Sequence, residues 1–230
     1  MQGPLKGSYV YTVKNVHKID VGRLIIVPIF AFLMTINILV VYQDLRGFLP
    51  INKIKATGLV HQLFVVCFFC LIIFLYILRS QAKSTSRSHV TNLIAIVATF
   101  IPFTLPFLGR PVLNKPETLL IANVIITISI VFSIYALGSL GKSFSIIPQA
   151  RKLIETGPYR VVRHPLYVSE LTGVFGLILA GPTILKIAMS LLLVVLQVYR
   201  AFQEEKLLAN IFPEYKEYSS RTARFIPGII

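Results

Sequence analysis

The sequence predicts an all-α integral membrane protein with about six helical segments, the last two of which form a short helical hairpin. Hydrophobic residues make up 55% of the 230 residues and charged residues only 14%, whereas a water-soluble domain carries about a quarter charged residues. The net charge is +14, but the basic residues lie between apolar segments, where anionic lipid headgroups attract them. We therefore expect a lipid bilayer, and not nucleic acid, as the partner.

Four apolar runs are long enough to span a bilayer, which takes about 20 residues. They cover residues 24–42, 59–78, 90–108 and 119–137. The first run follows a polar, basic stretch without a small-residue cleavage signal, so we expect it to be retained as a span. Pro102 and Pro106 are expected to bend the third run. The four runs define a predicted N-terminal four-helix transmembrane region, residues 1–138, which is followed by a second region, residues 139–230.

The apolar stretch 166–200 is interrupted by Gly181-Pro182. As one helix of about 35 residues it would be roughly 50 Å long, which exceeds the hydrocarbon core of about 30 Å. A single span would also place Lys186 deep in lipid. A hairpin that turns at Gly181-Pro182 avoids both problems and brings His164 and Glu205 to the same membrane face.

The distribution of basic residues predicts the orientation of these helices. With four spans and a hairpin, most of the 23 Lys and Arg residues fall on the side of both termini and the loop before the hairpin. Six fall on the opposite side, namely Arg46, Lys53, Lys55, Arg110, Lys115 and Lys186. Because cytoplasmic loops are enriched in Lys and Arg, the termini and this loop are predicted to be cytoplasmic. The membrane would be the plasma or inner membrane, or the endoplasmic reticulum of a eukaryote.

The loop before the hairpin ends in residues suited to a helix start. Pro165 fits the first helical position, where its missing N–H costs nothing, so His164 would be the cap and Tyr167 would lie in the first turn. Free N–H groups at a helix start attract anions. Together with Arg163 and His164 they predict a receptor for a carboxylate or phosphate. Upstream, the turn at Gly157 is expected to position Tyr159.

The returning helix ends in three charged residues. Arg200 and Glu204 are four residues apart and share a face, whereas Glu205 lies about 100° round the helix. The two adjacent carboxylates could hold a cationic ligand that has several donors. Taken alone, these residues could equally be solvated charges beside the membrane, and His164 could be an ordinary interfacial histidine.

Residues 157–167 and 200–205, together with 153–159, 212–215 and 224–227, resemble the isoprenylcysteine carboxyl methyltransferase and phospholipid methyltransferase superfamily. The resemblance covers about the last 90 residues and is strongest to the small microbial-type members. It implies that residues 139–230 form the methyltransferase catalytic region, in which the membrane hairpin and the cytoplasmic tail enclose a cofactor pocket.

The resemblance further implies S-adenosylmethionine as the methyl donor and S-adenosylhomocysteine as the product, with no metal. The residues implied in cofactor binding are Gly157, Tyr159, His164, Pro165, Tyr167, Glu204 and Glu205. Arg200, Arg163 and Glu204 are implied in catalysis, and Arg200 is favoured for orienting an acceptor carboxylate because it lies on the lipid-facing hairpin. Methyl transfer chiefly requires alignment of the reacting atoms at roughly 3 to 3.5 Å. The expected reaction is carboxyl O-methylation of a lipid-like or prenylated acceptor, with an amine headgroup as the alternative.

Two other functions remain open. Glu170 stands where many superfamily members have a small residue, and the related NADPH-dependent membrane sterol reductases often carry an acid near this position. Those reductases usually have several tryptophans near the C-terminus, and this chain has none. A transporter or membrane scaffold is the non-enzymatic alternative, since Asn37, Asn123 and Gln197 could line a path. Such amides also join helices by hydrogen bonds, and the sequence has no visible inverted repeat.

Overall fold

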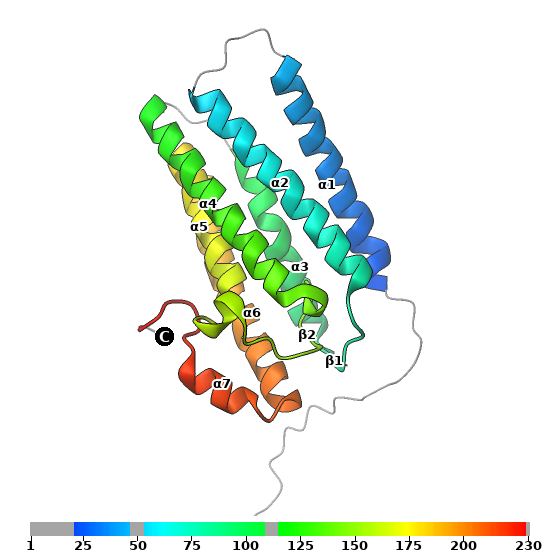
Figure 1. The fold of residues 1–230 in the computed structure, drawn as a ribbon. Coiled ribbons are helices and arrows are strands. Elements are labelled where there is room, and N and C mark those ends of the chain that lie inside the picture. The colour runs from blue at the N-terminus through cyan, green and yellow to red at the C-terminus, as the bar shows by residue number, and fades with distance from the viewer. Residues whose placement is uncertain (1–20, 47–52, 109–114, 229–230) are drawn as a thin grey trace, which may run out of the picture.

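The computed structural model describes residues 21–46, 53–108 and 115–228, and these form a bundle of long helices with a compact polar end (Figure 1). The helices are α1 (Val21–Arg46), α2 (Lys53–Leu78), α3 (His89–Thr104), α4 (Pro116–Leu140), α5 (Pro165–Ala180), α6 (Ile184–Ile211) and α7 (Tyr215–Arg221). The predicted all-α class is confirmed. Most of the basic N-terminal stretch and Arg110 lie outside the described residues.

Within the described residues, five helices are long and apolar enough to cross a membrane: α1, α2, α3 with its extension, α4 and α6. Their outer faces carry large exposed hydrophobic side chains, such as Phe32 at 66% and Leu191 at 63% exposure. In water such a surface would drive association, whereas in lipid it is the expected outer face. The chain is thus a multi-pass membrane protein, as predicted.

Proline residues lie near the end of the third helix, where a bend was predicted and the structure has a change of helix type. Pro102 lies inside α3, and Pro106 lies in the 3-10 turn η1 (Leu105–Phe107) that follows it. Proline has no N–H to donate to the helical ladder, which accounts for the change from α-helix to a tighter turn.

The hairpin turns at Gly181-Pro182, as predicted, but its two arms are unequal. Helix α5 has 16 residues and α6 has 28, or about 24 Å and 42 Å at 1.5 Å per residue. The hydroxyl of Thr183 accepts from the Lys186 N–H and donates to the Leu108 carbonyl. The buried Lys186 ammonium donates to the Gly181 carbonyl at 2.9 Å. The longer arm carries α6 beyond the start of α5 and into the polar end.

The polar end is formed where the chain crosses between helices. A two-residue ladder joins β1 (Ser84–Thr85) to β2 (Gln149–Ala150), with Ser84 opposite Ala150. This end also holds η2 (Gly141–Ser143), η3 (Gly157–Arg160), the start of α5, the end of α6 and α7 (Figure 1). The tail packs here through a cluster of Ala150, Leu207, Phe212, Tyr215 and Tyr218. The loop before the hairpin and the end of α6 therefore meet, as the sequence predicted.

Helix α5 is held against α4 by small residues. A Cβ on Gly176 would lie 2.6 Å from Ile126 Cγ1 and 3.3 Å from the Ala122 carbonyl oxygen. About two turns nearer the polar end, the Ser133 hydroxyl donates to the Ser169 hydroxyl at 2.8 Å. Small residues allow helices to approach closely in membranes. This contact sets the position of α5, and with it the position of His164 and Tyr167.

We expect Gly176→Ala to destabilise the protein by about 1–3 kcal/mol, because the added methyl group overpacks the contact between α4 and α5. The matched control is Gly58→Ala on α2, where an added Cβ meets nothing within 4 Å and should stabilise by about 0.5–1 kcal/mol. Thermal unfolding of the detergent-solubilised variants measures both effects. Equal midpoints for the two variants would contradict the tight α4–α5 contact.

Candidate active site

A pocket of about 120 Å³ opens at the polar end of the bundle. Its polar lining comes from the chain after α4, the loop before α5, the end of α6 and α7. These residues include Lys152, Tyr159, Arg163, His164, Glu204 and Tyr215. Four of the sequence-predicted site residues, Tyr159, Arg163, His164 and Glu204, thus lie on one pocket.

The loop before α5 is built as the sequence predicted. Pro165 is the first residue of α5 and His164 is its N-cap, and the His164 carbonyl accepts from the Tyr167 N–H at 3.1 Å. The His164 ring stacks on the Tyr167 ring with centroids 5.2 Å apart and planes 8° apart. The first turn of α5 therefore orients both aromatic side chains toward α6.

Gly157 opens the turn that carries Tyr159. Its φ is +59°, and an added Cβ would lie 2.6 Å from the Ser139 hydroxyl oxygen. Both features require glycine. Tyr159 is buried, and its carbonyl accepts from the Tyr218 hydroxyl at 2.8 Å. Burial raises the pKa of Tyr218 to about 12, so this phenol stays protonated and remains a donor at neutral pH.

Glu205 is surrounded by donors from two other parts of the chain, the loop before α5 and the C-terminal segment. Its Oε1 accepts from Arg163 Nε at 2.9 Å, Arg224 Nε at 3.0 Å and, with a suitable tautomer, His164 Nε2 at 3.1 Å. Its Oε2 accepts from Arg224 Nη2 at 2.9 Å. The hydrogen bond to Glu205 raises the pKa of the Arg224 guanidinium. The carboxylate that Arg163 and His164 contact in this structure is therefore the chain's own.

We call Glu205, Arg163, His164 and Arg224 the Glu205 cluster. It fastens the C-terminal segment to the loop before α5, where the Arg163 N–H donates to the Ala223 carbonyl at 2.8 Å and the His164 N–H to the Arg224 carbonyl at 3.2 Å. Arg163 Nη1 also donates to the carbonyls of Ser219 and Thr222. Sequence reasoning did not assign Arg224 to the site, although Arg224 opens one of the segments on which the resemblance rests.

Glu204 has a different environment from its neighbour. Its side chain is 24% exposed, against 12% for Glu205, and it faces the pocket. Its Oε1 accepts from the Tyr167 hydroxyl and lies 3.9 Å from Arg200 Nη2. The two adjacent carboxylates that the sequence grouped as one binding pair are thus separated, one on the pocket and one in the Glu205 cluster.

Arg200 is buried between α3, α5 and α6 and does not face lipid, which corrects the expectation from the sequence. Its Nη2 donates to the Ile146 carbonyl at 3.0 Å, and its Nη1 lies 3.3 Å from Gln197 Oε1 and 3.4 Å from Thr99 Oγ1. The guanidinium also lies over the Tyr167 ring. Its Nε is buried and has no hydrogen-bond partner among the described residues.

Gln197 links Arg200 to a further acid that sequence reasoning left without a role. Its Nε2 donates to Glu170 Oε2, and its side chain is fully buried. The spacing of Gln197, Arg200 and Glu204 places three polar residues on one face of an apolar helix. That spacing is the signal from which this cluster could have been found.

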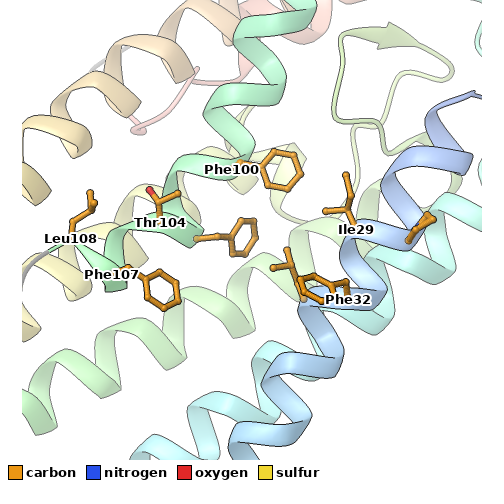
Figure 2. Close-up of a pocket in the computed structure, with 9 residues that line it drawn as sticks. Ile29, Phe32, Phe100, Thr104, Phe107 and Leu108 are labelled. Carbon is orange, nitrogen blue, oxygen red and sulfur yellow. The ribbon is translucent and has the colours of Figure 1, made fainter.

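A larger hollow of about 660 Å³ lies between α1 and α3 (Figure 2). The figure shows Ile29 and Phe32 on α1 and Phe100, Thr104 and Phe107 on the α3 side projecting toward it. The hydroxyl of Thr104 donates to the Ile101 carbonyl at 2.8 Å, and the other lining side chains are apolar. The chemistry-bearing groups lie at the polar end of the bundle, not in this groove.

We expect Glu205→Gln to loosen the C-terminal segment, because the amide cannot balance two guanidinium groups. Losing charge-assisted hydrogen bonds should cost about 2 kcal/mol, and amide hydrogen exchange of residues 222–225 should accelerate. In the control Glu217→Gln, an 81% exposed carboxylate 3.9 Å from Arg221 is removed, which should cost about 0–1 kcal/mol. Unchanged exchange in Glu205→Gln would show that the cluster does not hold the tail.

Comparison with known proteins yields a family and two curated relatives. The cobalt-zinc-cadmium resistance protein CzcN of Cupriavidus metallidurans is 39% identical over 84 residues, which are 34% of this chain and 36% of that protein. The nickel-cobalt-cadmium resistance protein NccN of Alcaligenes xylosoxydans xylosoxydans is 38% identical over 83 residues, covering 35% and 38%. The match thus spans little more than a third of the length of these relatives.

The family match covers residues 117–215. These residues contain α4, the loop before α5, the hairpin and the charged end of α6. Through this segment the chain is similar to the phospholipid methyltransferase family, which lies within the superfamily that the sequence resemblance indicated.

Proposed function

We propose that this protein is an S-adenosylmethionine-dependent methyltransferase that acts at the membrane surface on a lipid-like or prenylated acceptor, with carboxyl O-methylation as the reaction. The observation that carries the proposal is the pairing of a pocket-facing carboxylate, Glu204, with the buried guanidinium of Arg200 3.9 Å away. The first group suits the cationic donor, and the second suits an anionic acceptor.

The charges around Arg200 fit a cationic donor. Glu204 lies 3.9 Å from this guanidinium and is 24% exposed on the pocket side, so its carboxylate can attract a cationic ligand. Glu170 is joined to Arg200 only through the amide of Gln197. When bound, S-adenosylmethionine supplies its methyl group to the acceptor oxygen; a C–O bond forms, the C–S bond breaks, and the electron pair remains on the sulfur of S-adenosylhomocysteine.

The pocket offers distinct contacts for the parts of this donor. Glu204 can accept from an ammonium or ribose hydroxyl, and Tyr159, Tyr215 and Tyr218 provide aromatic surface beside apolar Leu153 and Leu207. Gly157 and Pro165 set the backbone of the loop, and His164 and Tyr167 orient Glu204. We assign Glu205 and Arg163 to holding the loop and tail closed over the pocket, because each already has several internal partners.

Arg200 can bind an acceptor carboxylate through its Nε–H, which has no partner among the described residues, because charge-assisted hydrogen bonds to carboxylates are strong. A carboxylate has no proton to lose on methylation, so this reaction needs no general base. The position of Arg200 among α3, α5 and α6 keeps water away from it, which strengthens the attraction for the acceptor.

We place this end of the bundle in the cytoplasm. Arg79, Lys83, Lys142, Arg151, Lys152 and Arg160 all belong to loops and turns at this end, as the preference of cytoplasmic loops for basic residues requires.

The two relatives are named as metal-resistance proteins. If this chain also acts in metal resistance, the proposed site indicates that it would do so by methylating a membrane component. The described residues contain no group of three His, Cys, Asp or Glu side chains that could hold a metal ion.

We expect purified full-length protein in detergent to bind S-adenosylhomocysteine saturably in a calorimeter, and Glu204→Gln to weaken this binding at least tenfold, or about 1.4 kcal/mol. Glu217→Gln, on the exposed face of α7, should bind as the unchanged protein does. Binding of NADPH without binding of the thioether would favour the reductase. Binding of neither by a protein with a cooperative melting transition would favour the scaffold or transporter.

A further inference from the structure

Glu170 is an acidic residue inside the membrane hairpin, one helical turn deeper than Tyr167. Ionisable residues within apolar helices are costly and are retained mainly for function. The side chain is mostly removed from solvent, and its carboxylate accepts from the amide of Gln197 on the facing helix. Glu170 is therefore expected to have a role that an apolar side chain at this position could not perform.

The Gln197 amide has one defined orientation. Its nitrogen donates to Glu170, and its oxygen accepts from Arg200 Nη1 at 3.3 Å. Because an amide donates only through nitrogen and accepts only through oxygen, Gln197 connects the carboxylate to the guanidinium in a fixed order. Gln197 has 0% exposure and Arg200 has 5%, so water does not compete for these contacts.

Arg200 is held from several directions but keeps one donor unused. Its Nη1 donates to Thr99 on α3 and to Gln197 on α6. Its Nη2 donates to the Ile146 carbonyl. Its Nε, in contrast, is buried without a partner among the described residues. An unsatisfied buried donor costs free energy, and the guanidinium that carries it lies over the Tyr167 ring and 3.9 Å from the pocket residue Glu204.

Glu170 also affects how closely Arg200 can approach the other nearby carboxylate, Glu204. Glu204 is 3.9 Å from Nη2 and could approach more closely if the guanidinium turned toward it. The contact through Gln197 draws the Nη1 side of the guanidinium toward α5. Arg200 is thereby kept from closing on Glu204, which remains available to the pocket.

We infer that Glu170 and Gln197 are positioning residues that hold the Arg200 guanidinium with its Nε–H directed at an acceptor carboxylate. This inference rests on the proposed methyltransferase function and assigns the selection of its carboxylate acceptor to Glu170 and Gln197. Glu170 acts through Gln197 and does not touch the reacting atoms.

The test uses three probes with the same chain, dodecanoate, dodecylamine and dodecanol, each titrated into full-length protein already saturated with S-adenosylhomocysteine. The unchanged protein should bind dodecanoate at least tenfold more tightly than either other probe. Glu170→Ala and Gln197→Leu should each weaken dodecanoate binding at least tenfold, while the dissociation constant of S-adenosylhomocysteine changes less than threefold. Glu170→Gln keeps an acceptor oxygen for Gln197 and should restore part of the dodecanoate affinity.

The control is Ser133→Ala, which removes a buried hydrogen bond to Ser169, about 100° round α5 from Glu170. It should lower the melting temperature without changing the preference among the probes. If Glu170→Ala likewise lowers the melting temperature without changing the preference among the probes, the role of Glu170 is purely structural and the inference is overturned. Preferential binding of dodecylamine, or no saturable dodecanoate binding by protein that binds the thioether, would overturn it too while leaving the methyltransferase proposal standing. Failure to bind the thioether would instead reject the proposed function.

Discussion

The Glu205 carboxylate holds together three segments that are far apart in the sequence, and the rest of the polar end depends on this contact. Arg163 and His164 approach it from the loop before α5, and Arg224 approaches it from the C-terminal segment. Two guanidinium groups around one carboxylate form charge-assisted hydrogen bonds, which are stronger than neutral ones. Without a central anion, Arg163 and Arg224 would repel each other, and the tail would have no electrostatic reason to lie against the loop.

This closure gives the neighbouring glutamates different tasks. Consecutive residues on a helix point about 100° apart, so Glu205 faces the tail while Glu204 faces the pocket. One carboxylate stabilises the site, and the other remains partly exposed beside His164 and Tyr167. A pair of adjacent acids at the end of a spanning helix can therefore combine structural support with ligand recognition.

Below the pocket, polar groups continue into the apolar part of the bundle along Glu204, Arg200, Gln197 and Glu170. Buried polar groups of this kind are tolerated when partners satisfy them, and here the partners come from α3, α5, α6 and the Ile146 carbonyl. Helix α5 brings Glu170 into place because its glycine-rich face packs tightly on α4. Close helix packing and charge placement are thus coupled: the small residues of α5 set how deeply the polar groups reach.

The sequence by itself determined the helical membrane class, the turn at Gly181-Pro182, the helix start at Pro165 and the segment that carries the family match. Each follows from a local property: the length of an apolar run, the missing N–H of proline, or the spacing of residues along one helix. Only the tertiary structure decided which charges pair. It separated Glu204 from Glu205, buried Arg200 where a lipid-facing position was expected, and added Arg224, Gln197 and Glu170 to the site. Such pairings depend on side-chain directions and on the approach of segments 19 to 101 residues apart, which periodicity along a single helix does not specify.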